Sequence, residues 1–401
     1  MNKTTLPTIS QLTNLKGKKV LLRVDLNLPM VDGKISDDTR LLRVMPTIKF
    51  LLEKGAIVIL LSHFGRPKNV YDPSLSLAPI ADVISSHLKE KVYFGVDVIG
   101  LEVANKVASL KAGEIILLEN LRFHKQEEAN DKNFAKEIAG LGDIYVNEAF
   151  SCSHRKHASI YALAQLLPSY AGFSFANEIK YLEILTKNPH KPFAGIVGGA
   201  KVSSKIEVLY SLLDKVDALF IGGGMANTFL LAEGHQLGKS LVEKDYIQEA
   251  KKILKKANVL GKKIYLPIDA VVAKEFKQSP ETEIKAIDRV GADEMILDIG
   301  IKTTQYWLSD LEKFKTVFWN GPVGAFEKSP FDNGTISLIR KIVSLTADAE
   351  LISIAGGGDI LSAIAKSGHQ NNFTYISTAG GAFLEWLEGK TLPGVEVLNS
   401  I

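Results

Sequence analysis

Two lysines follow a double glycine in the stretch GIVGGAKVSSKIEVL, residues 195–209. Backbone N–H groups of a glycine turn at a helix N-terminus make a ready anion site. The Walker pattern, Gly-x-x-x-x-Gly-Lys-Ser/Thr, does not fit this stretch. Lys201 and Lys205 are four residues apart, and we expect both within the helix that follows the glycines. An isolated pair of this kind would suit a solvated helix face. After a double glycine, two ammonium groups could instead neutralise a phosphoryl group moving between two ligands.

Basic side chains recur in the first half, in loops that directly follow predicted strands. In doubly wound sheets ligands bind at the carboxyl ends of strands, where successive arginines would converge and repel each other without an anion. A guanidinium fork binds phosphate or carboxylate in bidentate fashion, so the pattern predicts a site for a small, heavily anionic ligand. A single arginine there would more often be a surface residue. The basic side chains are Arg23, His63, Arg66, Arg122, His154 and Arg155, with Arg40 at a helix start, and the same loops carry the polar Asp25 and Asn27.

Glycine clusters take the place of the arginines in the second half and offer bare backbone to a larger anion. Two of them, in GGGMAN and GGGDIL, lack the third glycine of the dinucleotide fingerprint, which argues against a nicotinamide-dependent dehydrogenase. The stretch GHQLGKS is one residue too short for a Walker loop and follows no strand, so we expect an ordinary loop. The clusters are Gly198-Gly199, Gly222-Gly223-Gly224, Gly356-Gly357-Gly358 and Gly380-Gly381.

Metal binding is predicted at one carboxylate and not at the histidines. Asp359 follows three glycines at a helix start, where a carboxylate either complements the helix dipole or helps to hold Mg²⁺ beside nucleotide phosphates. The preceding glycines favour the metal. His63, His154 and His157 lack the spacing of a zinc triad with acidic partners.

The elements that position these residues alternate between short apolar runs and longer amphipathic stretches. Continuously apolar strands predict parallel sheets covered by helices on both faces. A chain of 401 residues suits two domains, and a seam is expected in YAGFSFANEIKYLEILTKNPHKPF, residues 170–193. The predicted strands lie in KKVLLRVDL, AIVILLS, IILLEN, DIYVNEAF, FAGIVG, ALFIGGG, KIYLPIDA, TVFWNGP, AELISIAGGG and FTYISTAGG.

Composition narrows the cellular setting. With 46% hydrophobic and 23% charged residues and a net charge of +3, nothing points to a nucleic-acid or membrane partner. Cys152 is the single cysteine, so no internal disulfide can form and a reducing compartment is expected. Neither an apolar signal-peptide core at the N-terminus nor a stretch of about 20 apolar residues is present. We expect a cytoplasmic protein.

Taken together, these stretches closely resemble the phosphoglycerate kinase family over nearly the whole chain and in the family's order. The resemblance implies two doubly wound domains joined by a long helix with a hinge cleft, in a monomer. The implied ranges are 1–172 for phosphoglycerate binding, 173–189 for the helix, 190–384 for nucleotide binding and 385–401 for a tail returning to the first domain. It rests on KKVLLRVDLNLP, DDTR, SHFGRP, LENLRF, YVNEAF, HRKHAS, GGAKVSSKI, IGGGMANTF, WNGPVGAFE, GGGD and ISTAGGAFLEWLEGKTLPGV.

The resemblance also implies an activity, the reversible transfer of the acyl phosphate of 1,3-bisphosphoglycerate to ADP, directly and in line after domain closure. ATP and ADP would be substrates, with Mg²⁺ held by Asp359. Catalytic roles would fall to Arg40, Lys201, Gly357 and Gly380. The phosphoglycerate site would comprise Asp25, Asn27, Arg40, His63, Phe64, Gly65, Arg66, Arg122 and Arg155. The nucleotide site would comprise Lys205, Gly223, Gly224, Ile296, Asn320, Pro322, Glu327, Gly357, Gly358, Asp359 and Ile360.

Several positions depart from the family's pattern, and none removes a charged group named above. Ile296 replaces a usual glycine, Glu148 a usual aspartate and Ala379 a usual glycine. These changes concern the shape of the adenine slot and hinge. The rival to catalysis, a non-enzymatic nucleotide sensor, predicts loss of Lys201, Arg40 or Asp359, and all three are present. Further departures are Leu28, Ile301 and Ile360.

Overall fold

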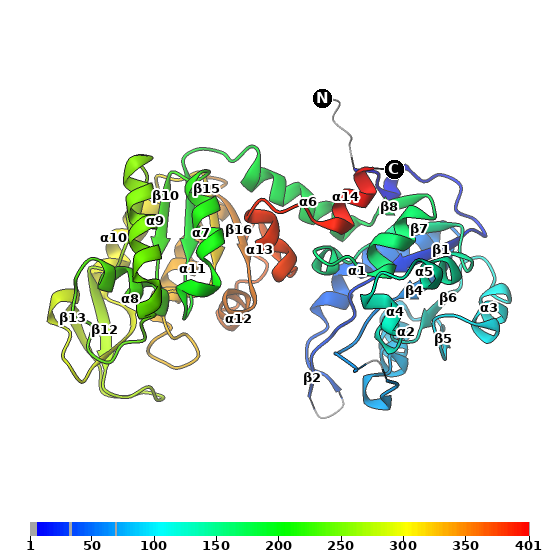
Figure 1. Ribbon diagram of the computed structural model, residues 1–401, viewed down its shortest axis with the longest axis horizontal. Coiled ribbons are helices and arrows are strands. Elements are labelled where there is room, and N and C mark those ends of the chain that lie inside the picture. Colours follow the sequence, from blue (N-terminus) through cyan, green and yellow to red (C-terminus); the bar gives the residue numbers. More distant parts are fainter. Residues whose placement is uncertain (1–5, 32–33, 69, 401) are drawn as a thin grey trace. The chain divides into compact units, whose positions relative to one another are not determined.

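The computed structural model describes residues 6–31, 34–68 and 70–400. Residues 1–5 and 401, which belong to the predicted first domain and tail, lie outside this description. Contacts divide the chain into two units (Figure 1): the first runs to Lys180 and resumes at Thr391, and the second spans Tyr181–Lys390. Each contains a six-stranded parallel sheet, so the predicted fold class is confirmed.

The sheet of the first unit has the strand order β5-β6-β4-β1-β7-β8. Its central strand β1 pairs in parallel with β4 and β7, so the loops after these strands leave the same edge of the sheet. The strands are β1 (Lys19–Arg23), β4 (Ile57–Leu61), β5 (Val92–Gly95), β6 (Ile115–Leu118), β7 (Ile144–Asn147) and β8 (Ser169–Ala171), beside a hairpin of β2 (Met30–Val31) and β3 (Lys34–Ile35).

Helices bury both faces of this sheet, which explains why its strands are apolar at successive positions. On one face Val20 and Leu22 pack with residues of α1 and α2 in one core. On the other, the buried Tyr145 hydroxyl donates a hydrogen bond to the Ser159 carbonyl in a π-helical segment, Ala158–Ala162. The helices of the unit are α1 (Thr39–Glu53), α2 (Ala78–Leu88), α3 (Leu101–Ala108), α4 (Lys125–Glu128), α5 (Lys132–Ala139) and α14 (Pro393–Asn399).

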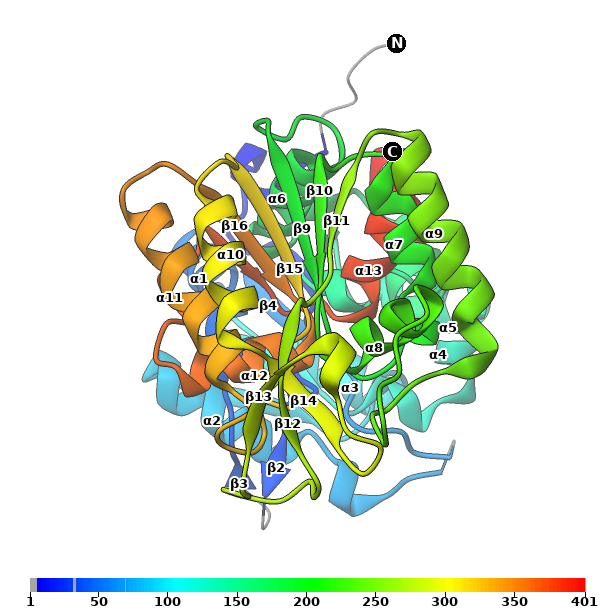
Figure 2. The same cartoon turned by 90° about the vertical axis from the view of Figure 1, so that its left-hand side faces the viewer.

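The second unit repeats the plan with the strand order β11-β10-β9-β15-β16-β17. Figure 2 shows α7 and α9 on one side of its sheet and α10 and α11 on the other. The strands are β9 (Phe193–Val197), β10 (Ala218–Ile221), β11 (Lys263–Tyr265), β15 (Thr316–Asn320), β16 (Ile352–Gly356) and β17 (Tyr375–Ser377). The helices are α7 (Ile206–Leu213), α8 (Gly223–Ala232), α9 (Ile247–Val259), α10 (Ile301–Leu311), α11 (Asn333–Ala347), α12 (Gly358–Lys366) and α13 (Gly381–Leu387).

A small antiparallel sheet in the second unit was absent from the sequence prediction. Its order is β13 (Glu283–Ala286), β12 (Asp269–Ala273), β14 (Met295–Ile299). The stretch KIYLPIDA, predicted as one strand, is divided between β11 and β12, so that prediction is wrong. Pro267 lies at the break, and a proline has no N–H to donate to a strand ladder.

Helix α6 (Phe173–Thr186) contains the division between the units and begins with an unusual anchor. The first N–H groups of a helix lack partners within it. Here Phe173 N donates to Thr47 Oγ1 at 3.1 Å, and Ser174 N and Phe175 N each donate at 3.0 Å to the carboxylate of Glu148. All three donors are therefore satisfied by side chains of the first unit. None of the described helices is both long and apolar enough to span a membrane.

Candidate functional site

The predicted site residues of the first unit lie at the carboxyl ends of neighbouring strands. Asp25 and Asn27 follow β1, the segment from His63 to Arg66 follows β4, Arg122 follows β6 and Arg155 follows β7. These four strands are adjacent in the sheet, in the order β6-β4-β1-β7. The parallel topology therefore brings together loops that are far apart in the sequence.

Hydrogen bonds connect the polar members of this group. Arg40 Nη1 lies 3.3 Å from Asp25 Oδ2 and donates to the Asn27 carbonyl at 3.0 Å. Asn27 Oδ1 in turn accepts from Gly65 N at 2.9 Å. Burial opposes ionisation of Asp25, but the neighbouring His63 and Arg40 and a hydrogen bond from Ser151 hold the pKa of Asp25 below its ordinary value. The carboxylate thus fixes Arg40 at the first turn of α1.

The other predicted members differ in how they face a ligand. Arg122 donates to the Gly65 carbonyl at 2.5 Å, and burial, with the charge of Arg155 adding to it, lowers the pKa of Arg122. Arg66 is exposed and Arg155 half-buried. The Phe64 side chain is 7% exposed and belongs to the core, so only its backbone could meet a ligand.

A buried cluster beneath these loops offers one ligand atom each from Asp25, His63 and Cys152, all within 4.8 Å of one another. A metal there would be placed against Arg23, whose Nη2 lies 3.2 Å from His63 Nδ1 and 3.7 Å from Cys152 Sγ. Arg23 is 1% exposed and cannot withdraw into solvent. The arrangement therefore does not suit a cation. Sequence reasoning grouped Arg23 with the exposed loop residues and missed that it points inward.

In the second unit the two lysines are not on one helix face, and that expectation is corrected. Lys201 precedes a 3₁₀ turn (Val202–Ser204), and α7 begins only at Ile206. Lys201 is exposed, whereas Lys205 Nζ donates to the carbonyls of Gly198 at 2.6 Å and Asn320 at 3.2 Å. Burial lowers the pKa of Lys205 to about 8, with the charge of Asp359 acting against the shift. The backbone of Lys205, with φ −136 and ψ 9, is not helical and separates the turn from α7.

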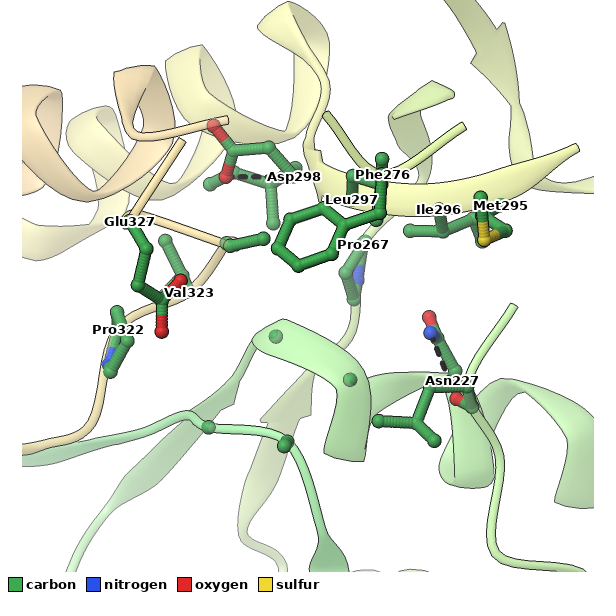
Figure 3. Close-up of a pocket in the computed structure, with 18 of the residues that line it drawn as sticks. Asn227, Pro267, Phe276, Met295, Ile296, Leu297, Asp298, Pro322, Val323 and Glu327 are labelled. Carbon is green, nitrogen blue, oxygen red and sulfur yellow. Dashed lines mark hydrogen bonds between the residues drawn. The ribbon is translucent and has the colours of Figure 1, made fainter. Parts of the chain in front are cut away.

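A cavity of about 330 Å³ opens beside these groups (Figure 3). Strand β14 forms one wall, and the glycines before and within the start of α8 form another. Gly223 has φ +67, and a Cβ on it would lie 2.7 Å from the Gly199 carbonyl oxygen, so the close approach of the two loops requires glycine. The cavity collects six of the predicted nucleotide-site residues, namely Gly223, Gly224, Ile296, Pro322, Glu327 and Asp359.

The apolar part of the cavity was largely missed by sequence reasoning. Figure 3 shows Phe276 and Pro267 beside β14, with Met295 and Ile296 further along the strand. Phe276 is 46% exposed although it is a large aromatic residue. These residues come from the small antiparallel sheet and its loops, which carried no glycine or charge signal. An apolar slot with polar groups at one end is typical of a small-molecule site.

The remaining predicted residues lie at or after the carboxyl ends of β15, β16 and β17 and do not line the cavity. Asn320 is 2% exposed and its amide donates to the Gly356 carbonyl. Gly357 has φ +111 and precedes α12, and Gly380 has φ +55 and precedes α13. Ile360 is completely buried, so only its backbone could meet a ligand.

The Asp359 carboxylate meets the requirements for holding Mg²⁺. It is exposed in the first turn of α12, it lines the cavity, and among the described residues it has no hydrogen-bond partner. One carboxylate with phosphate oxygens and waters is a usual ligand set for this ion.

Comparisons with known proteins agree on one family. A model of phosphoglycerate kinase matches residues 9–390. The phosphoglycerate kinases of Rhizobium meliloti (strain 1021) and Methylorubrum extorquens (strain PA1) are each 51% identical, over 98% of this chain and 99% and 98% of their own. Solved phosphoglycerate kinases from Coxiella burnetii and Pyrococcus horikoshii OT3 match with TM-scores of 0.91 and 0.83 and identities of 40% and 33%. The first match covers 99% of each chain, and the second covers 98% of each chain.

Proposed function

The chain belongs to the phosphoglycerate kinase family, and from this premise we propose which residues bind each substrate and which take part in the transfer. The reaction is the reversible transfer of the acyl phosphate of 1,3-bisphosphoglycerate to ADP, a phosphotransferase reaction with a carboxyl group as acceptor. We propose that residues 1–172 bind phosphoglycerate and 190–384 the nucleotide, with 173–189 as the linking helix and 385–401 returning to the first domain.

In the first domain Arg40, His63, Arg66, Arg122 and Arg155 hold the phosphate and carboxylate of the ligand. Asp25 and Asn27 orient them, and the backbone of Phe64 and Gly65 completes the site. What supports this assignment is the convergence of loops from four adjacent strands, linked by the contacts of Asp25, Arg40 and Asn27. Bidentate guanidinium groups suit both ends of such a ligand.

In the second domain the apolar slot receives the base of ADP or ATP. Ile296, Gly223, Gly224, Asn320 and Pro322 border or support it, and Glu327 accepts from the ribose hydroxyls. Lys205 and the backbone of Gly358 and Ile360 meet the phosphates. Mg²⁺ held by Asp359 would neutralise charge on those phosphates. Lys201, Arg40 and the N–H groups at Gly357 and Gly380 stabilise the phosphoryl group in transit.

No covalent intermediate on the protein is needed, because the two substrates can be held in line. The single observation that carries the nucleotide assignment is the cavity with Asp359 and Glu327 among its lining residues and Lys205 beside Asp359. We further propose a cytoplasmic monomer that needs no nucleic-acid or membrane partner.

A coupled assay with ADP, Mg²⁺ and 1,3-bisphosphoglycerate tests the proposal. We expect ATP formation that depends on added Mg²⁺ and is lost in Asp359→Asn. ADP binding without any ATP formed would instead favour the nucleotide sensor. Turnover unchanged in Asp359→Asn would overturn the metal assignment while leaving the family's activity intact.

A further inference from the structure

Arg23 is a fully buried arginine whose donors point to four acceptors, one of which is the distant Cys152 Sγ described above. Its Nε donates to Ser159 Oγ at 2.9 Å, and Nη1 donates to the Val24 carbonyl. Its Nη2 lies 3.2 Å from His63 Nδ1. A guanidinium can only donate hydrogen bonds. In the contact with His63, therefore, the Nδ1 atom must be the acceptor.

On its other side, Arg23 is connected through Ser159 to a buried carboxylate. Ser159 Oγ accepts from Arg23, so its own proton is free to go to Glu127 Oε1, 2.6 Å away. Ser159 N donates to the other oxygen of Glu127 at 2.9 Å. Glu127 is 1% exposed and offsets the buried charge of Arg23. A buried, fully connected network of this kind holds its members in one arrangement.

We propose that Glu127, Ser159 and Arg23 form a relay that fixes His63 as a neutral imidazole with its proton on Nε2. Arg23 occupies the Nδ1 lone pair, so only the Nε2–H group remains for a ligand. His63 then binds phosphoglycerate as a hydrogen-bond donor and not as a cation. Arg23, Ser159 and Glu127 act through His63 and are positioning residues. This inference rests on the proposed role of His63 in the phosphoglycerate site.

The charges around His63 point the same way. Burial and the Arg23 charge hold the pKa of His63 well below its ordinary value, and Arg122 and His157 add to this effect. Asp25 opposes it, and the Cys152 thiol, 4.0 Å from Nδ1, is kept protonated because burial raises its pKa. A neutral donor keeps the affinity for phosphoglycerate independent of His63 ionisation between about pH 5 and 8.

The tautomer can be measured directly in the free enzyme by nitrogen-15 NMR of the histidine rings, with the His63 signal assigned by its loss in His63→Gln. We expect a protonated Nε2 and a bare Nδ1 at pH 7, and the same pattern at pH 5.5. A proton on Nδ1, or a doubly protonated ring at pH 7, would overturn the proposal. Adding 3-phosphoglycerate to the same sample separates the two claims: an unshifted His63 signal contradicts its binding role but not the relay.

Variants test whether the relay is the cause. Ser159→Ala leaves Arg23 Nε and Glu127 without their shared partner, and Ser159→Thr restores the hydroxyl. In Ser159→Ala, and in Arg23→Met where it folds, the His63 pKa should rise towards its ordinary value. The variant's Michaelis constant for 3-phosphoglycerate is divided by the wild-type value at the same pH, which removes the effect of the ligand's own titration. This ratio should fall several-fold from pH 7.5 to 5.5.

The control Arg289→Met makes the same chemical change at an exposed position of the second unit and should leave this ratio flat. Ser159→Thr should return the ratio to that of the wild type. If folded Ser159→Ala keeps both the wild-type tautomer and a flat ratio, the relay does not position His63.

Discussion

Lys201 and Lys205 carry the same charge in different surroundings, and this predicts different roles. Lys205 is bound to two carbonyl oxygens and helps to hold the loop in place. Lys201 is exposed, and no hydrogen bond to its ammonium group is found in the described part of the chain. A mobile cation of this kind can follow charge that develops on a phosphoryl group.

Lys201→Ala should therefore reduce kcat by about a hundredfold or more, in line with the loss of one electrostatic contact in the transition state. ADP should still bind, because the cavity residues remain. Steady-state kinetics and titration calorimetry with ADP check the two statements, with Lys255→Ala on the exposed face of α9 as a control. Loss of ADP binding with an intact kcat would assign Lys201 to ground-state binding instead.

Ile296 should tune nucleotide affinity and not chemistry. It lines the cavity and also packs against the core cluster around Leu230 and Val272. Shielding about 40 Å² from water is worth roughly 1 kcal/mol, and a strained rotamer would cost about the same. Ile296→Gly should change the KM for ADP by less than about tenfold, with kcat nearly unchanged.

The exposed Ile284→Gly in the same sheet controls for loss of sheet stability. The shift in KM can differ between ADP and GDP, since only the base meets this position. A collapse of kcat with an unchanged KM would mean that Ile296 supports a conformational step.

For single residues, the clustering of the charged side chains was predictable because parallel strands bring the loops that follow them to one edge of the sheet. Asp25, Asn27, Arg40, Gly65 and Arg122 are joined by direct contacts. The inward turn of Arg23 was not predictable, since it depends on a carboxylate and a serine more than 100 positions away. Apolar residues that line the cavity, such as Phe276, give no functional signal in the sequence. An exposed aromatic residue there cannot be told apart from one that packs in the core.

Among the elements, α6 is anchored by a carboxylate that burial keeps hard to ionise. Burial raises the pKa of Glu148 to about 7, against the effect of hydrogen bonds from Thr47, Phe175 and Ser174. A raised pKa favours the protonated folded state. Its contribution to stability is complete below the unfolded value of 4.5 and is lost as pH rises through about 7.

The free energy of unfolding of the wild type should therefore fall between pH 4.5 and 7.5 as Glu148 ionises. In Glu148→Gln this fall should be smaller by up to about 3 kcal/mol. The amide adds a cost at every pH, because its NH₂ group meets the N–H donors of α6. Urea unfolding, followed by labelling of Cys152 with a disulfide reagent that reacts in acid, reports on the first unit alone. Parallel pH profiles for wild type and variant would show that Glu148 does not titrate in this range.

Element boundaries were predictable where apolar runs were long, as in β4 and β15, and failed where a non-helical residue or a proline intervened. Helix α7 begins only at Ile206 because the backbone of Lys205 is not helical, and β11 ends before Pro267. The sheet β13-β12-β14 was missed because β13 is short and mostly exposed, while an aspartate begins β12 and another interrupts the apolar run of β14.

For the whole molecule, the placement of the two proposed substrate sites on separate units implies a conformational change. The groups proposed for phosphoglycerate belong to one contact unit, and those proposed for the nucleotide belong to the other. Direct transfer requires the donor and acceptor oxygens to meet in line, and open water at that point would favour hydrolysis. With the proposed sites, neither ligand alone would contact both sets of groups.

Small-angle scattering should therefore show a smaller radius of gyration with both ligands bound than with either alone. Mg²⁺-ADP with 3-phosphoglycerate suits the measurement, because this pair has no phosphoryl group to transfer and the complex persists. Binding energy from both ligands is available to drive closure only in the ternary complex. Arg122→Met, which should weaken phosphoglycerate binding, should require more 3-phosphoglycerate to reach the same radius. Equal radii in all ligand states, at concentrations where calorimetry shows both sites filled, would mean that transfer does not depend on domain closure.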